Sequence, residues 1–268
     1  MIAHICVTCG TQFSPTPAPP ASCPICQDER QYIGAGGQRW TTAQAMQATH
    51  MNAWRQHEPG LFGIGTVPAF AIGQRALLIQ APGGNVLWDC VSLLDDATVA
   101  LVRALGGVRA IAISHPHYYS AMVDWAHAFA AEILLHEADA AHVMRPDPSI
   151  RFWSGASLDL GDGLTLLHAP GHFDGAAMLH WAGGAGGTGA LLSGDIYQVV
   201  PDRRFISFMR SYPNLVPLSA RQVRALETVT EPYAFTRIYG AWWDRVILHD
   251  AKEVVARSAA RYVAALNG

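Results

Sequence analysis

The chain has 268 residues, of which 50% are hydrophobic, so it can form one large domain with a sizeable core and a small appendage. Its formal net charge of -3 gives no electrostatic reason to expect a nucleic-acid partner, and no apolar run reaches the roughly 18 residues of a membrane span. The N-terminus lacks the basic and apolar regions of a signal peptide, so we expect a cytoplasmic protein.

Residues 1–36 are predicted to form a separate small domain that is organised by cysteines. Two Cys-x2-Cys pairs, separated by a proline-rich stretch, can offer four thiolates from two tight turns. A redox dithiol would explain one pair and not two. So short a segment has too few apolar residues for a core, so a structural Zn²⁺ with no open coordination position would supply its folding energy. The predicted ligands are Cys6, Cys9, Cys23 and Cys26.

The second predicted domain, residues 37–268, begins after a glycine-rich hinge and alternates strands with helices. Expected helices are 41–57 (capped by Thr41 or Thr42), 92–106, 121–130, 138–144, 219–229 and 250–266. Expected strands are 76–80, 86–91, 108–113, 133–136, 158–160, 164–168, 176–181, 190–193 and 235–243. The glycines at 184–189 fit a dinucleotide fingerprint by letters, but a strand follows them where that motif needs a helix.

Histidines and aspartates recur where these strands end. Asp89 follows one strand, His115 and His117 follow the next, and His172 and Asp195 lie on glycine-containing loops further along. A single histidine would more often be a core or surface residue, but several at equivalent strand ends favour an active site assembled at one edge of a sheet. Neutral imidazole is a good ligand for zinc and iron, so we expect a metal there.

This order of motifs (Asp, His-x-His, Gly-His-x-x-Gly, Gly-Asp) resembles that of the metallo-β-lactamase superfamily over residues 60–268. The resemblance implies an α/β (α+β) fold, a four-layer αββα sandwich with the metal site at one edge between two sheets. The N-terminal domain resembles a rubredoxin-type zinc ribbon. The Gly-x-Ser-x-Gly motif of serine hydrolases is absent.

The sequence departs from the superfamily at its second metal. The usual motif is His-x-His-x-Asp-His, but Tyr119 and Ser120 stand at its last two positions, and residues 238–243 lack the usual late histidine. His249 is a weak substitute. The resemblance therefore implies one metal at most, Zn²⁺ or Fe²⁺, held by the main-site ligands His115, His117, His172 and Asp195.

The resemblance also suggests roles around this metal. Asp195 would be a fourth ligand or would orient the attacking water, and Asp89 would support the loops from the second shell. Tyr119 and Ser120 would either donate hydrogen bonds to a developing oxyanion or only fill the space of the lost metal. The candidate substrate pocket consists of Tyr118, Phe173, Tyr197, Trp242, Arg203 and Arg204, although for the two arginines we favour a solvated surface pair over a site for a carboxylate or phosphate.

These features favour a mononuclear metal-dependent hydrolase of a small, fairly apolar ester, thioester, lactone or amide. One alternative is a pseudoenzyme or binding protein that keeps the fold. Another is an iron-dependent oxidoreductase. We expect a small-molecule substrate, neither nucleic acid nor membrane as partner, and a homodimer would suit the aromatic content.

Overall fold

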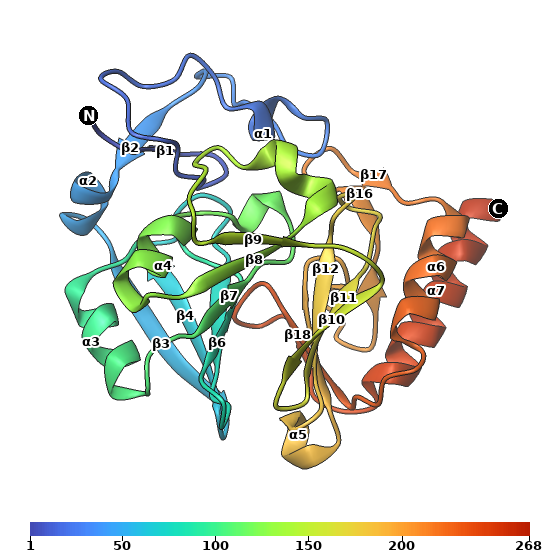
Figure 1. The fold of residues 1–268 in the computed structure, drawn as a ribbon. Helices are drawn as coiled ribbons and strands as arrows, with labels where there is room; N and C mark the ends of the chain where they lie inside the picture. The colour runs from blue at the N-terminus through green and yellow to red at the C-terminus, as the bar shows by residue number, and fades with distance from the viewer. The chain divides into compact units, whose positions relative to one another are not determined.

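The computed structural model describes residues 1–268, which divide into two compact units (Figure 1). The first contains Met1–Leu135 and Asp139–Phe152, and the second contains His136–Ala138 and Trp153–Gly268. The cysteine-containing segment belongs to the first unit, where β1 (His4–Cys6) pairs with β2 (Trp40–Thr42). The boundary predicted at residue 36 therefore lies within a segment that returns to pair with its own start.

The first unit is built on a seven-stranded sheet in the order β3-β4-β5-β6-β7-β8-β9. Its central strands β6, β7 and β8 are parallel, and parallel neighbours need crossover connections, which the helices α3 and α4 supply. Figure 1 shows these two helices on one side of the sheet. The elements are β3 (Met51–Glu58), β4 (Leu61–Val67), β5 (Arg75–Ile79), β6 (Val86–Trp88), α3 (Asp96–Ala104), β7 (Ala110–Ala112), α4 (Met122–Phe129), β8 (Glu132–His136) and β9 (Ile150–Trp153).

The parallel core of this sheet positions the first candidate ligands. The chain leaves β6 at Asp89 and leaves β7 at the segment that carries His115 and His117. Because β6 and β7 are parallel neighbours, their carboxyl ends meet at the same sheet edge. The first unit also contains α1 (Pro24–Gln27), α2 (Ala43–Gln47) and the 3₁₀ turn η1 (Pro116–Tyr118), and the 3₁₀ segment η2 (Glu137–His142) enters it at Asp139.

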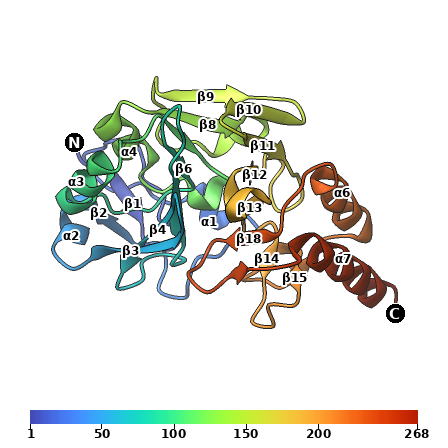
Figure 2. The ribbon, with the colours of Figure 1, turned by 90° about the horizontal axis from the view of Figure 1, so that it is seen from below.

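The second unit is built on a six-stranded sheet in the order β10-β11-β12-β13-β18-β19. Helices α6 and α7 lie side by side (Figures 1 and 2) and pack on its apolar core. Its main elements are β10 (Ser157–Gly161), β11 (Leu164–His168), β12 (Ala177–Trp181), α5 (Gly184–Gly187), β13 (Ala190–Gly194), α6 (Ala220–Thr230), β18 (Arg237–Gly240), β19 (Val246–Ile247) and α7 (Ala251–Asn267). Two small hairpins complete it, formed by β14 (Gln198–Val199) with β15 (Ile206–Ser207) and by β16 (Met209–Ser211) with β17 (Val216–Pro217).

Most predicted elements are confirmed, including the terminal helix and the Ser219 cap of α6, which forms a full capping box with Gln222. The helix predicted from residue 41 to 57 is wrong. Thr42 does cap a helix, but α2 ends at Gln47 and the chain continues as β3. Strands β4 and β9 were not predicted, and the predicted helix 138–144 is the 3₁₀ segment η2. None of the helices combines the length and apolar character needed to cross a membrane.

Candidate metal centres

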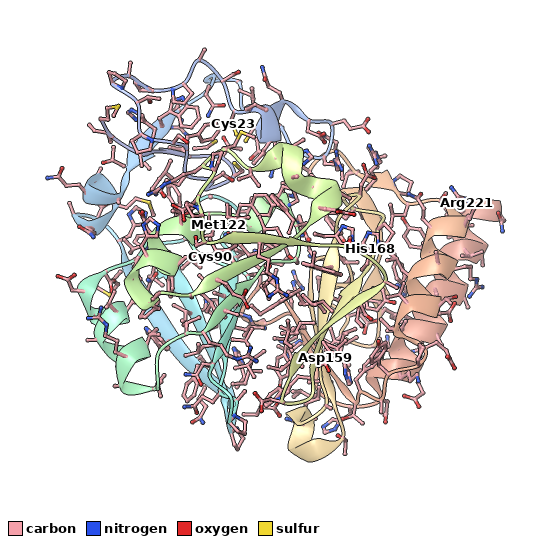
Figure 3. The ribbon with its side chains drawn as sticks, viewed as in Figure 1. Cys23, Cys90, Met122, Asp159, His168 and Arg221 are labelled. Carbon is pink, nitrogen blue, oxygen red and sulfur yellow. The ribbon has the colours of Figure 1, made fainter.

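The four cysteines of the N-terminal segment form a buried sulfur cluster (Cys23 is labelled in Figure 3). All four Sγ atoms lie within 4.8 Å of one another. The Sγ atoms of Cys6 and Cys26 are 3.6 Å apart, and those of Cys9 and Cys23 are 3.7 Å apart. A tetrahedral ion with metal–sulfur bonds of about 2.3 Å needs sulfurs about 3.8 Å apart, so the cluster fits one.

Local backbone structure presents these sulfurs. Cys6 ends β1, and the N–H of Gly10 donates to the carbonyl of Cys6 at 2.9 Å, which closes the first turn. Cys23 caps α1, whose first position is Pro24, a residue suited to that place because it has no N–H to satisfy. Gln38 Nε2 donates to Cys6 Sγ at 3.2 Å, a contact that stabilises a thiolate.

The thiols influence one another's protonation. Hydrogen bonding with Cys23 lowers the pKa of Cys6, and hydrogen bonding with Cys26 lowers the pKa of Cys23. Hydrogen bonding with Cys23 raises the pKa of both Cys9 and Cys26, and burial raises them further. The fifth cysteine, Cys90, is buried outside the cluster, and burial raises its pKa, as expected for a small core residue.

His115 and His117 lie in the histidine loop, residues 114–120, which follows β7. Both side chains are buried. The loop starts with the N–H of Ser114 donating to Asp89 Oδ1 at 2.8 Å, and Ser114 Oγ lies 3.0 Å from His115 Nδ1. Asp89 itself has a left-handed backbone (φ 59). The carboxylate of Asp89 thus contacts the start of the loop, and its role as a residue that supports the loop stays a prediction.

His172 is fixed by its own unit. Its Nδ1 lies 3.1 Å from the carbonyl oxygen of Met209. Because a carbonyl only accepts, Nδ1 carries the proton and Nε2 keeps the lone pair that a metal ligand requires. The neighbouring Phe173 is fully buried in the core of the second unit, and its ring meets that of His172 edge-on at 5.3 Å.

The three histidines form a candidate metal group, since their ligand nitrogens all lie within 4.8 Å of one another. All three imidazoles are buried. Three neutral imidazoles are a donor set that proteins use for zinc and iron, so the residues present fit a metal ion. The group contains no fourth residue, and the cysteine cluster is the other such group in the chain.

Asp195 follows β13 and is buried in the second unit. Tyr212 Oη donates to the backbone carbonyl of Asp195 at 2.8 Å and lies 3.4 Å from that of Ser207. Burial first, and the negative charge of Asp195 second, raise the pKa of Tyr212, so the phenol keeps its proton. Tyr212 thus fixes the backbone that carries the expected fourth ligand.

Tyr119 and Ser120 stand where the superfamily has its second-metal ligands. Tyr119 is buried, its Oη is 3.5 Å from the carbonyl oxygen of Asp139, and burial raises its pKa. A phenol of raised pKa is a poor metal ligand because it resists forming the phenolate. Ser120 Oγ donates to the carbonyl of Cys90 at 3.2 Å and accepts from Gln74 Nε2 at 3.0 Å. The hydroxyl proton of Ser120 is therefore engaged inside the protein.

The aromatic residues expected around the substrate fall into three groups. Tyr118 is fully buried, with its ring 4.4 Å from that of His115. Phe173 and Tyr197 belong to the core of the second unit, and Tyr197 Oη donates to the carbonyl of Leu226 at 2.6 Å, so Tyr197 packs the core instead of lining a pocket. Trp242 lines an open groove of about 550 Å³ with Gln198, Trp243, Asp244 and Arg245.

The two arginines behave as surface residues. Arg203 is exposed, and the Arg204 side chain is 78% exposed and pairs with Asp202 at 2.8 Å. This pairing lowers the pKa of Asp202 to about 2. The geometry favours the solvated-pair interpretation over a binding role.

Sequence reasoning missed several supporting residues. Ser114 directly precedes His115, and this position was the one signal in the sequence that Ser114 could support the histidine. Tyr212 and the Met209 carbonyl contact their partners from 17 and 37 residues away, so nothing in the sequence near Asp195 or His172 indicated them.

Several solved structures are similar to this chain in fold. No model of a known protein family matches the chain. The metallo-β-lactamase SMB-1 aligns with a TM-score of 0.53 at 16% identity, covering 77% of this chain and 94% of SMB-1. VMB-1 aligns with a TM-score of 0.59 at 10% identity, covering 81% and 98%. TTHA1623 in a di-iron-bound form aligns with a TM-score of 0.53 at 22% identity, covering 74% and 98%.

These likenesses, with the two candidate metal groups, define a protein of the metallo-β-lactamase fold and confirm the predicted fold and α/β class. The chain belongs to the same family as the uncharacterized protein YmaE of Bacillus subtilis (strain 168). The two are 50% identical over 266 residues, which cover 98% of this chain and 97% of YmaE.

Proposed function

We propose that this protein is a mononuclear metal-dependent hydrolase of small, fairly apolar esters, thioesters, lactones or amides. The observation that carries the proposal is the group of three buried histidines whose ligand nitrogens lie within 4.8 Å of one another. Catalytic metal sites commonly have three protein ligands and an open position for water or substrate. A cluster of four cysteines has no such position, so the catalytic metal belongs to the histidines.

A Zn²⁺ or Fe²⁺ ion held there would supply Lewis acidity, which polarises a substrate carbonyl and makes water more acidic. The chain's own residues prepare the site for it. Ser114 and the Met209 carbonyl orient two imidazoles through their Nδ1 atoms. Asp195, on a backbone held by Tyr212, is proposed as the fourth ligand or as the base that takes a proton from the attacking water.

The proposal of a single metal is supported by the two positions that end the histidine loop. Tyr119 is a buried phenol of raised pKa, and Ser120 is engaged with Cys90 and Gln74. Neither side chain offers the charged or imidazole ligand that a second ion would need. We therefore assign Ser120 no role as an oxyanion donor, because its proton already has an acceptor.

The groove beside Trp242 is the proposed place for the substrate's apolar part. It is open, holds two indole rings and borders the loop that follows β18. Large aromatic surfaces with a few polar groups are typical of small-molecule sites. The polar groups here are Gln198, Asp244 and Arg245.

Two alternatives remain distinguishable. The first alternative is an iron-dependent oxidoreductase, which is suggested by TTHA1623, a protein of this fold that holds two irons in its solved structure. A pseudoenzyme or binding protein would keep the fold without needing the metal. Iron in protein purified from its native source would favour the first, and activity or binding that survives removal of the histidines would favour the second.

Metal analysis of the purified full-length chain tests the proposal. We expect about two metal equivalents, one per candidate group, and about one in the His115→Ala/His117→Ala double variant. A panel of esters, thioesters, lactones and amides should show turnover by the native protein that the double variant lacks. Three or more equivalents in the native protein would refute the single-metal site, and equal turnover by the double variant would refute the catalytic role of the histidines.

A further inference from the structure

The segment that links the cysteine cluster to the rest of the first unit, residues 10–12, contacts the end of the histidine loop. Gln12 N–H donates to the carbonyl of Ser120 at 2.9 Å. Ser120 is the last residue of that loop, three positions after His117. A backbone hydrogen bond therefore connects the segment that follows the first cysteine pair with the loop that carries His115 and His117.

The conformation of this segment is set by the cysteine turns. Gly10 follows Cys9, has a left-handed backbone (φ +83) and donates to the carbonyl of Cys6 at 2.9 Å. The N–H of Cys6 donates to the carbonyl of Thr11 at 3.0 Å, and the Thr11 hydroxyl lies 3.4 Å from Cys9 Sγ. A metal that fixes Cys6 and Cys9 would thus fix the segment as well.

Side chains then hold the segment against the first unit at several points. Ser92 Oγ donates to the carbonyl of Gly10 at 2.7 Å. Gln12 Nε2 donates to Asp124 Oδ2 at 2.7 Å, and Arg145 donates to both Gln12 Oε1 and Asp124 Oδ1. Gln12 is only 3% exposed, whereas the side chains of Arg145 and Asp124 are 16% and 35% exposed, so the Gln12 end of these contacts is shielded from water.

Ser120 needs such support because its own backbone is strained. Its φ of 45 lies in the left-handed region, which a residue with a side chain occupies only when its surroundings hold it there. Three contacts hold it. The N–H of Gln12 donates to the carbonyl of Ser120. The Ser120 hydroxyl accepts from Gln74 and donates to the carbonyl of Cys90, which is labelled in Figure 3. The other end of the loop is held by Asp89 through Ser114.

We propose that the metal in the cysteine cluster positions the histidine loop, through residues 10–12 and Ser120, so that loading the cysteines raises the metal affinity of the histidine site. Gln12 and Ser120 are then positioning residues that touch no substrate. The inference rests on the metal binding that the proposed function assigns to the histidines, and not on hydrolysis. Supports of this kind change metal affinity by about 10- to 100-fold.

The testing variant is Gly10→Ala, which leaves every cysteine and histidine in place. A Cβ at Gly10 would meet Ser92 Oγ at 2.5 Å, on a backbone that an L residue rarely adopts, so either the segment or the Ser92 hydroxyl that holds it must shift. The matched control is Gly37→Ala, which also has a positive φ (+75) but would meet nothing within 4 Å. Gly37→Ala therefore introduces the same kind of backbone strain but displaces no neighbouring atom.

Cobalt titration of metal-free full-length protein separates the two sites, because only the cysteine cluster gives thiolate charge-transfer absorption. In Gly10→Ala we expect a filled cysteine cluster, a histidine site weakened about 10- to 100-fold, and faster hydrogen exchange at residues 114–120. Gly37→Ala should bind as the native protein does. Native affinity at the histidines in Gly10→Ala, or equal losses in both variants, would overturn the inference.

If Gly10→Ala does not fold, Gln12→Ala takes its place, since it removes the side-chain contacts with Asp124 and Arg145 without adding atoms. A histidine site weakened in Gln12→Ala, with the cysteine cluster still filled, supports the inference, and native affinity overturns it. A native protein that binds no cobalt at its histidines would instead sink the proposed function, so the two failures are distinguishable.

Discussion

Replacing Ser114 with alanine tests how the protein prepares His115 for a metal. Ser114 is fully buried, and its Oγ lies 3.0 Å from His115 Nδ1. If Nε2 of His115 binds the metal, Nδ1 carries the proton and donates to this hydroxyl. Ser114→Ala removes this acceptor, so the buried Nδ1–H of His115 loses its hydrogen bond to Ser114. The hydrogen bond from the backbone N–H of residue 114 to Asp89 remains.

The size of the effect follows from the loss of one buried hydrogen bond and of the ring's fixed orientation. Losing a hydrogen bond so that its partner is left buried costs about 1–3 kcal/mol. Loss of a supporting contact to a ligating histidine lowers metal affinity by about 10- to 100-fold, which corresponds to about 1.4–2.7 kcal/mol. The two ranges agree, so we expect zinc affinity at the histidine site to fall within that interval.

The assay is competition with a chromophoric zinc chelator, after the cysteine cluster has been filled. Ser258→Ala is the matched control, because Ser258 is also fully buried and its Oγ accepts one hydrogen bond, from Ile206 N–H at 3.0 Å. Both variants should lose about 1–3 kcal/mol of unfolding free energy, but Ser258→Ala should keep native zinc affinity. Equal affinities in Ser114→Ala and the native protein would show that this contact does not prepare the histidine.

Three further outcomes are expected. Tyr212→Phe should cost about 1–3 kcal/mol of unfolding free energy, because the buried carbonyl of Asp195 loses its donor, and urea denaturation measures it. Tyr119→Phe should leave the metal content unchanged and cost about 0.5 kcal/mol, so loss of a metal equivalent by mass spectrometry would contradict our assignment. Burial, and then the charge of Arg75, lower the pKa of His57 to about 4 from its ordinary 6.5, and its Nε2 accepts from Arg75 at 2.7 Å. The unfolded state therefore binds more protons between these values, so stability should fall as pH drops from 6.5 toward 4, and His57→Gln should flatten this dependence in denaturation curves at pH 7 and 5.

The N-terminal cluster and most elements of the second unit were predictable from local pattern. Two Cys-x2-Cys pairs determine four sulfurs at two turns, because each turn is short enough to fix its own geometry. Ser219 and Gln222 are three apart, so the capping box of α6 is encoded where it forms. The order of histidines and aspartates likewise predicted the fold that the solved structures confirm.

Strand β3 was decided by tertiary structure. Residues 51–58 follow a capped helix and carry no clear alternation, yet they form a strand because β4 pairs with them from Met51 to Glu58. Strand propensity depends on the neighbouring strand, and a partner further along the chain can override the local continuation of a helix. The prediction of one long helix failed for that reason.

The sequence by itself determined which candidate ligands exist: four cysteines, three histidines and no late histidine for a second metal. Only the tertiary structure decided how they are held. Tyr212 supports the backbone of Asp195, and Gln12 reaches Ser120 from 108 positions earlier in the chain. Hydrogen bonds between distant residues leave no periodic or spacing signal, because the folded backbone alone brings their atoms within bonding distance.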